Sequence, residues 1–156
     1  MKVQIMTDSQ YGNGKKLAET IKSVFSKDEV NIDDVKDISP QKVAENVPDV
    51  FILGGAIRAF HGDTKSKKFL KQLNELLEKS GKKIKYGTGF LTHSLPTKRV
   101  QGFSKRYLKH IQNASMIDKT YNPLLTAQVE TMQGPIKPEE MEKAKKYIQD
   151  FIAWMK

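Results

Sequence analysis

A segment rich in hydroxyl and glycine residues follows the first apolar stretch of the chain and has the composition of a phosphate-binding turn. Residues 7–14 read T-D-S-Q-Y-G-N-G, and helical spacing of apolar residues starts soon afterwards, at Leu17. Backbone N–H groups at the N-terminus of a helix, joined by hydroxyls such as that of Thr7, can surround a phosphate without any lysine. The sequence therefore predicts an anion-binding loop between the first strand and the first helix.

The same composition also suits a tight strand-to-helix turn, in which Gly and Asn are needed only because they tolerate a positive φ angle. Two other phosphate-binding motifs are absent, since neither G-x-x-x-x-G-K-[ST] nor G-x-G-x-x-G occurs in the chain. The loop is therefore neither a P-loop nor a Rossmann fingerprint.

The elements that must position this loop alternate between strand-like and helix-like patterns. Strand-like stretches occupy residues 3–6, 30–35, 50–53, 84–90 and 124–129. Helical spacing marks residues 17–25, 69–77, 100–111 and 141–155, and Ser39-Pro40 has the composition of an N-cap and first residue of another short helix. Strands that alternate with helices require crossover connections and a parallel sheet covered on both faces. We therefore expect one doubly wound α/β domain over residues 1–156.

In a sheet of this kind, ligands bind beyond the carboxyl ends of the strands, where the strand order reverses. The loops after the first, third and fourth strands are therefore the candidate ligand loops. The third strand is an unbroken apolar run that ends at Gly54-Gly55, and the fourth is followed by a polar segment that contains His93. We expect these loops to meet at one site.

Residues 7–14 resemble the phosphate loop of flavodoxins, whose pattern is T/S-x-S/T-x-T/x-G-N-T/A. The resemblance places six residues on that loop: Ser9, Gln10, Tyr11, Gly12, Asn13 and Gly14. Gly14 stands where the family commonly has threonine, so one hydroxyl of the family pattern is absent. The resemblance implies a flavodoxin-like three-layer sandwich that binds flavin mononucleotide (FMN), with a five-stranded parallel sheet of order 2-1-3-4-5 and helices on both faces.

The other two loops are also similar to those of flavodoxins. In D-V-F-I-L-G-G-A-I-R-A-F-H-G-D, the resemblance assigns Gly54, Gly55, Ala56 and Ile57 to the flavin-ring loop and Phe60 or His61 to an aromatic cover. In K-K-I-K-Y-G-T-G-F-L-T-H-S, it aligns Gly87, Thr88 and Gly89 with the G-x-G of the family and His93 with the tyrosine that stacks on the flavin. Phe90 replaces an acidic residue of the family pattern.

Three functions are compatible with these loops. The flavodoxin resemblance implies an FMN-dependent electron carrier, with no catalytic residue of its own. The stretch G-G-A-I-R-A-F-H also looks like a loop of flavodoxin-fold protoporphyrinogen oxidases, which implies a flavin-dependent oxidoreductase for a porphyrinogen, quinone or other small substrate; residues 92–109 are basic enough to receive an anionic one. A basic α/β binding module without flavin is the third. A response regulator is disfavoured, since only Asp8 follows the first strand where an acidic pair is needed.

The basic charge of the chain is concentrated in its middle third. The formal net charge is +9 over 156 residues, and residues 54–110 hold 14 basic and 3 acidic side chains. This distribution is typical of a solvated basic surface or of docking to redox partners with acidic faces. Arginine-rich arms and zinc-finger spacing are absent, so nucleic acid is not expected as a partner. We expect a monomer or a weak dimer.

The residue types also limit the chemistry and the compartment. The absence of cysteine excludes disulfides, thiolate metal sites and Cys nucleophiles. The three histidines, at positions 61, 93 and 110, are too scattered to indicate a metal cluster. No apolar run approaches the roughly 20 residues that span a bilayer, and the N-terminus lacks the apolar core of a signal peptide. The sequence thus predicts a soluble cytoplasmic protein without a metal site.

Overall fold

The computed structural model describes residues 1–58 and 63–156, and its strands and helices alternate along most of the chain. The strands are β1 (Lys2–Thr7), β2 (Glu29–Asp34), β3 (Val50–Ala56), β4 (Ile84–His93), β5 (Ile117–Thr120) and β6 (Leu125–Gln128). The helices are α1 (Asn13–Val24), α2 (Pro40–Glu45), α3 (Thr64–Ser80), α4 (Thr97–Gln112) and α5 (Pro138–Met155). This alternation agrees with the expected α/β class.

The strands form one parallel sheet in the order β2-β1-β3-β4-β5, and β6 also pairs with β4. The predicted order 2-1-3-4-5 is confirmed. The central strands β1, β3 and β4 are buried on both faces over most of their length, which explains why they are unbroken apolar runs in the sequence. The order reverses between β1 and β3, so this pair marks the expected ligand edge.

The last strand differs from the expected single strand over residues 124–129. Two short strands instead pair with the ten-residue β4, with β5 lying beside its first half and β6 beside its second half. Pro123 lies between them, and a proline has no N–H to donate to a strand ladder. The sequence of β5 is I-D-K-T, and only its first residue is buried, so periodicity gave no signal for it.

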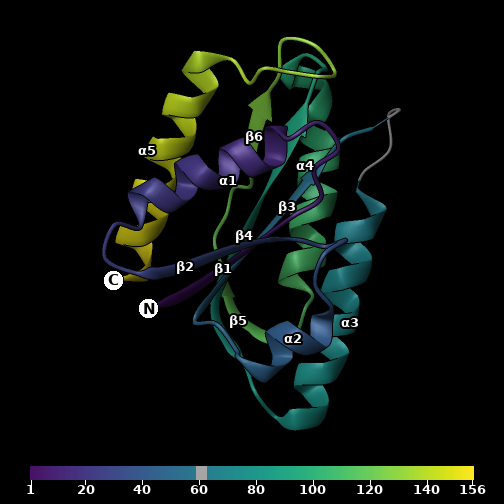
Figure 1. Ribbon diagram of the computed structural model, residues 1–156, viewed down its shortest axis with the longest axis vertical. Helices are drawn as coiled ribbons and strands as arrows, with labels where there is room; N and C mark the ends of the chain where they lie inside the picture. Colours follow the sequence, from purple (N-terminus) through teal and green to yellow (C-terminus); the bar gives the residue numbers. More distant parts are fainter. Residues whose placement is uncertain (59–62) are drawn as a thin grey trace.

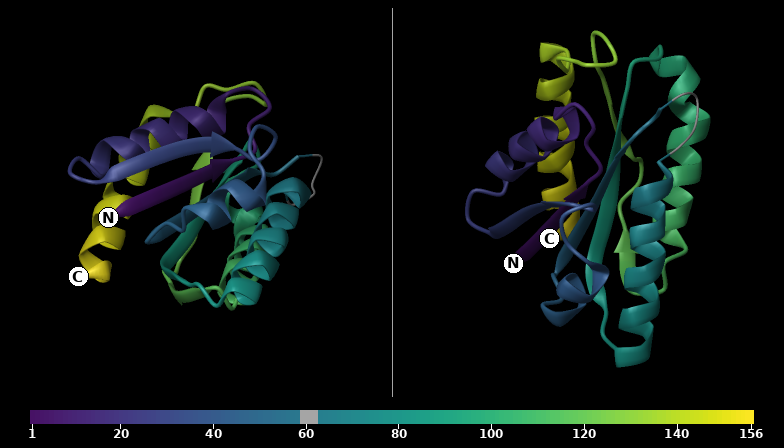
Figure 2. Two further views of the ribbon diagram at one scale, coloured as in Figure 1. Left: turned by 60° about the horizontal axis from the view of Figure 1, so that its bottom comes forward. Right: turned by 45° about the vertical axis from the view of Figure 1, so that its right-hand side comes forward.

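The helices cover the sheet in two layers, which Figures 1 and 2 show on opposite sides of the strands. Helices α1 and α5 lie on one face and pack through Leu17, Ile21 and Ile148. Helices α2, α3 and α4 lie on the other face, where the apolar side chains of α3 and α4 meet the sheet. The predicted three-layer sandwich is therefore confirmed.

Local signals fix three of the helix ends. Ser39 caps α2 by accepting a hydrogen bond from the N–H of Lys42, and Gly81 ends α3 with a φ of 70°. Helix α3 begins at Thr64, earlier than its apolar residues indicate, because the Asp63 side chain accepts a hydrogen bond from the N–H of Ser66. Among the described residues, no helix combines the length and the apolar composition needed to cross a membrane.

Candidate flavin site

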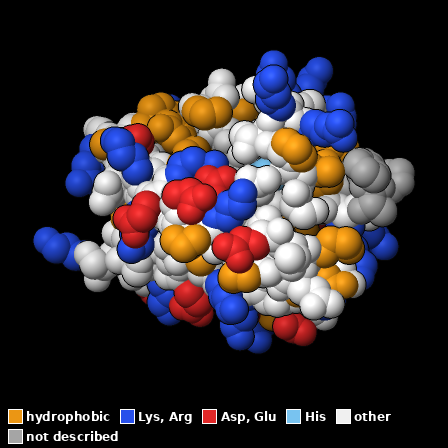
Figure 3. All heavy atoms as spheres, turned by 90° about the horizontal axis from the view of Figure 1, so that it is seen from above, with side chains coloured by type: hydrophobic (Ala, Val, Ile, Leu, Met, Phe, Trp, Pro, Cys, Tyr) orange, Lys and Arg blue, Asp and Glu red, His pale blue; other side chains and the backbone are white. Residues whose placement is uncertain are grey.

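The main cavity lies at the carboxyl ends of β1, β3 and β4, where the strand order predicted a site. Its volume is about 500 Å³, which falls within the range of about 300–1,000 Å³ typical of small-molecule sites. The walls bring together residues from four segments: Asp8, Ser9, Gln10, Tyr11, Asn13, Gly14, Ala56, Ile57, Arg58, Thr92, His93, Ser94, Leu95, Val129 and Met132. Figure 3 views this end of the molecule, where acidic side chains gather near the middle and Lys and Arg side chains surround them.

The loop between β1 and α1 has the geometry of an anion site. Gly12 precedes α1 with a φ of 85°, a left-handed conformation that glycine adopts without steric cost. No side chain among the described residues caps α1, so the N–H groups of its first turn remain suited to an anionic ligand. The Ser9 Oγ atom is buried and has no hydrogen-bond partner in the described part of the chain. A buried hydroxyl of this kind is costly unless a ligand or water completes it.

The loop after β6 closes this side of the cavity. Gly134 has a φ of 101° and packs so closely on Asn13 that any Cβ at position 134 would collide with the Asn13 amide. From the same loop, Met132 reaches the cavity rim with 69% of its surface exposed, and Tyr11 is 44% exposed at the rim of the phosphate loop. The cavity mouth therefore has an apolar border.

His93 is the last residue of β4 and is only 2% exposed, so it is a buried wall residue rather than an exposed loop histidine. Its Nδ1 atom lies 2.8 Å from the carbonyl oxygen of Leu95. Since a carbonyl only accepts, Nδ1 must carry the hydrogen, which leaves Nε2 as an acceptor. Nε2 is buried and without a partner among the described residues. The stacking of His93 on a flavin ring stays a prediction.

Stability at low pH should depend on His93. Burial lowers its pKa, and the charges of Lys143 and Lys137 act the same way, while the Leu95 hydrogen bond and Glu140 oppose this. The unfolded chain therefore binds a proton more readily, and stability falls as the pH drops below about 6.5. We expect the unfolding free energy of the wild type to fall more than that of His93→Gln between about pH 7 and about pH 5. Denaturant titrations at both pH values measure this, and equal losses would contradict it.

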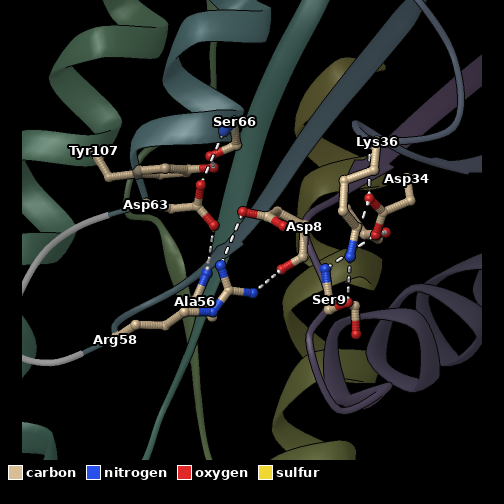
Figure 4. A network of polar contacts seen from close by, with 10 residues as sticks. Asp8, Ser9, Asp34, Lys36, Ala56, Arg58, Asp63, Ser66 and Tyr107 are labelled. Atoms are coloured by element: carbon tan, nitrogen blue, oxygen red, sulfur yellow. Dashed lines mark hydrogen bonds and ion pairs between the residues drawn. The ribbon is translucent and has the colours of Figure 1, made fainter.

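A partly buried ion pair joins the phosphate loop to the loop after β3. Arg58 Nη1 donates to Asp8 Oδ2 at 3.0 Å, and Nη2 donates to the Asp8 carbonyl at 2.8 Å. The Asp8 side chain is 1% exposed and that of Arg58 is 35% exposed. Both residues line the cavity, and Arg58 is the more accessible of the two. Figure 4 shows Arg58 reaching from the end of β3 to Asp8. Sequence reasoning missed this pair, because the flavodoxin pattern leaves the position of Asp8 unspecified and the stretch G-G-A-I-R-A-F-H, which contains Arg58, indicates no partner for it.

Asp63 holds the other end of the same loop. Its carboxylate accepts hydrogen bonds from the N–H groups of Ala56 and Ser66, at 3.1 and 2.9 Å, and therefore ties the end of β3 to the start of α3 (Figure 4). Burial raises the pKa of Asp63, the neighbouring Asp8 raises it further, and the two N–H donors oppose these effects. A Cβ at Gly55 would lie 2.7 Å from the Asp63 Cβ, so glycine at position 55 makes room for this anchor.

The structure does not bring Gly87, Thr88 and Gly89 to the cavity. They lie inside β4, whose end is three residues later than the expected Phe90. Thr88 is fully buried, and its hydroxyl lies 2.6 Å from the hydroxyl of Tyr147 on α5. The structure thus places these residues inside a strand and not in a loop, where they pack against neighbouring strands and helices, and the residues after the strand, Ser94 and Leu95, line the cavity. A ligand role for Gly87, Thr88 and Gly89 stays a prediction.

The remaining predicted site residues divide between the cavity and its surroundings. Ser9, Gln10, Tyr11, Asn13, Gly14, Ala56, Ile57 and His93 all line it. Gly54 and Gly55 lie within β3 below it. Thr7 and Gly12 line a second hollow of about 330 Å³ on the other side of the phosphate loop. Phe60 and His61 fall outside the described residues. Among the described residues, no group of three side chains could hold a metal ion.

Comparisons with known proteins agree with this geometry. A family model described as a flavodoxin domain matches residues 4–156. Oxidised flavodoxin 2 from Bacillus cereus is similar in structure, with 15% identity, a TM-score of 0.70, and coverage of 98% of this chain and 99% of that one. A WrbA-like flavodoxin from Agrobacterium tumefaciens has 14% identity and a TM-score of 0.70, with coverage of 96% and 93%.

A larger protein contains a similar unit. Rubredoxin oxygen:oxidoreductase from Desulfovibrio gigas is 16% identical with a TM-score of 0.72, and the match covers 95% of this chain but 34% of that chain, so the present chain spans about a third of its length. No curated protein sequence matches. The structural likenesses, all at low identity, show the fold. The family model matches almost the whole length, and the chain therefore belongs to the flavodoxin family.

Proposed function

We propose that this chain binds FMN in the main cavity and carries electrons between redox proteins in the cytoplasm. The observation that supports it most is the pairing of two features in one cavity: the uncapped N-terminus of α1 beside the unpartnered Ser9 hydroxyl, and an apolar wall at Ile57 and Leu95. FMN has a phosphate for the first feature and a flat aromatic ring for the second. When bound, it supplies the one- and two-electron redox chemistry that no side chain of this protein provides.

Different residues of the site would bind the phosphate and the ring of such a ligand. The Ser9 hydroxyl and the N–H groups of the first turn of α1 would bind the phosphate, and none of the described residues that line the main cavity is a lysine. Ile57, Leu95 and Val129 would exclude water from the ring. Because Asp8 neutralises Arg58 in the cavity wall, the described lining adds no net charge of its own.

Titration of the ligand-free protein with FMN tests this function directly. We expect a perturbed visible flavin spectrum, quenched flavin fluorescence and saturation at one FMN per chain. Riboflavin, which lacks the phosphate, serves as the control and should bind more weakly. If FMN leaves both signals unchanged at protein concentrations well above the dissociation constants typical of cofactors, the chain is a non-flavin α/β module.

Helix α4 is the surface that we propose for docking of an acidic redox partner. It carries five basic residues and no acidic one, and all five are exposed: Lys98, Arg99, Lys105, Arg106 and Lys109. Its first turn follows directly on Leu95 of the cavity wall. A positive surface beside the redox site would steer acidic proteins to it and raise their association rate.

Charge reversal at the start of α4 should slow electron transfer from an acidic partner. We expect Lys98→Glu with Arg99→Glu to lower the second-order rate with a reduced, acidic ferredoxin-type protein about tenfold at low salt, since steering effects span about 10–10³. The loss should shrink at high salt because exposed charges are screened. Stopped-flow absorbance measures the rate. Lys105→Glu with Lys109→Glu, which reverses the same number of charges about 10–15 Å farther along the helix, is the control; an equal loss there would show that only net charge matters.

A substrate-specific oxidoreductase is the second candidate, and one observation favours it. Basic residues Lys98 and Arg99 stand next to a cavity whose mouth is bordered by the exposed side chains of Tyr11 and Met132. This combination could receive an anionic molecule such as a porphyrinogen, or a quinone without charge. Substrate oxidation or reduction by the FMN-loaded protein, with no second protein present, would establish this activity in place of the carrier.

A further inference from the structure

The start of the phosphate loop is held from outside the cavity by the end of β2. Asp34 Oδ2 accepts hydrogen bonds from the Ser9 N–H at 3.0 Å and from the Thr7 hydroxyl at 3.3 Å. Its other oxygen, Oδ1, accepts from the N–H of Lys36 at 3.0 Å, which orients the carboxylate. The two strands are in register here, with Thr7 paired to Asp34. One carboxylate thus joins the last residue of β1 to the second residue of the loop.

Lys36 holds the other polar backbone group of Ser9, its carbonyl, which belongs to the next peptide group. Its Nζ atom donates to the carbonyl oxygen of Ser9 at 3.0 Å and lies 3.8 Å from Asp34 Oδ1. Figure 4 shows Asp34 and Lys36 next to each other on one side of Ser9, away from the Arg58 pair. Both the N–H and the C=O of Ser9 are therefore fixed by side chains that do not line the main cavity. The two polar backbone groups of Ser9 are therefore both held in place before any ligand binds.

We propose that Asp34 is a positioning residue for phosphate recognition: it sets the Ser9 backbone so that the Ser9 hydroxyl and the following N–H groups are directed at the ligand phosphate before the ligand arrives. This inference rests on the proposed binding of FMN. The Asp34 side chain is 15% exposed and negatively charged, and it occupies the Ser9 N–H. Its negative charge alone would weaken the binding of a phosphate, whereas its positioning of Ser9 would strengthen it. These two effects on FMN binding have opposite signs.

The opposite signs make the test decisive. The quantity measured is the ratio of the riboflavin to the FMN dissociation constant, which isolates the contribution of the phosphate. Asp34→Ala should lower this ratio about tenfold, equivalent to about 1.4 kcal/mol, because the loop loses its anchor. Asp34→Asn keeps an oxygen for the Ser9 N–H and should retain most of the ratio. If Asp34 acted only through its charge, both variants would raise the ratio, and the proposal would be overturned.

Asp33→Asn is the matched control for charge. Its carboxylate lies next in sequence but accepts from the Gln4 side chain at 3.0 Å instead of from the loop. This variant removes the same charge without touching Ser9, so its ratio should stay equal to that of the wild type or rise. A fall as large as that of Asp34→Ala would contradict the proposal.

Amide hydrogen exchange tests the positioning without any flavin. In the ligand-free wild type, the Ser9 N–H should exchange slowly because Asp34 accepts it, and in Asp34→Ala it should exchange much faster while the amides of β3 are unchanged. Fast exchange of Ser9 in the wild type overturns the proposal even if Asp34→Ala does not fold. Slow exchange together with no FMN binding would instead retain the loop anchor and refute the proposed function.

Discussion

Ser9→Ala should weaken the binding of FMN about ten- to a hundredfold and leave the binding of riboflavin nearly unchanged. The Ser9 Oγ atom is buried in the loop before α1 and has no partner among the described residues, so it is ready to donate to an anion. Loss of one hydrogen bond to a charged group costs about 1.5–3 kcal/mol, which corresponds to this range of affinities. Fluorescence titrations with the two flavins measure the difference.

Ser94→Ala is the control for this experiment. Ser94 also lines the cavity but stands after β4, on the side assigned to the ring, and is exposed. Its replacement should change the two affinities by the same small factor. Equal losses for FMN and riboflavin in Ser9→Ala would remove Ser9 from the phosphate site and leave its hydroxyl with a role in the loop alone.

The fold could be predicted from the sequence because its signals are local and agree with one another. Unbroken apolar runs such as residues 50–53 identify central strands that are buried on both faces, and the helices carry one apolar stripe each. The strand β5 was not predicted, because an edge strand with one buried residue has no apolar pattern to detect. Its position depends on pairing with the long β4, which is a tertiary property.

The candidate site was only partly predictable, since some of its residues act through contacts that no local pattern encodes. The loop over residues 7–14 has a characteristic composition, and the structure places most of it at the cavity; its binding of phosphate stays a prediction. Arg58 and Asp8 are 50 positions apart, and their pairing follows from the adjacency of β1 and β3. Asp34 likewise reaches Ser9 only because β2 lies beside β1. Such long-range polar contacts require the strand register before they can be inferred.

The role of a glycine is also difficult to predict from the sequence alone. A family pattern marks Gly54 and Gly89 as ligand residues, but both lie in the sheet, where side chains and backbone of neighbouring elements occupy the space beside them. A Cβ at Gly54 would collide with the ring of Phe90 across the strand pair. A missing side chain can therefore serve packing as well as a ligand, and the sequence alone does not distinguish the two uses.

Gly89→Ala should accordingly destabilise the protein without a specific effect on flavin affinity. A Cβ at position 89 would lie 2.6 Å from the carbonyl oxygen of Leu53 and 2.7 Å from Ile111 Cδ1. The backbone oxygen belongs to the paired strand β3 and can move little. Overpacking of this kind costs about 1–3 kcal/mol. In a chain of this size that lowers the Tm by about 2–4 °C per kcal/mol, and differential scanning calorimetry of the flavin-free variant measures it.

Gly14→Ala provides the opposite pattern and completes the comparison. Its Cβ would meet the Ser9 Cβ at 3.5 Å, an ordinary contact, and alanine favours the helical conformation of α1 over glycine by about 0.5–1 kcal/mol. The Tm should therefore stay the same or rise. The new methyl group would lie 3.7 Å from Ser9 Oγ, in the proposed phosphate site. We therefore expect the affinity for FMN to fall. If Gly89→Ala instead lost flavin affinity at an unchanged Tm, the ligand role that the family pattern gives to Gly89 would be restored and its packing role rejected.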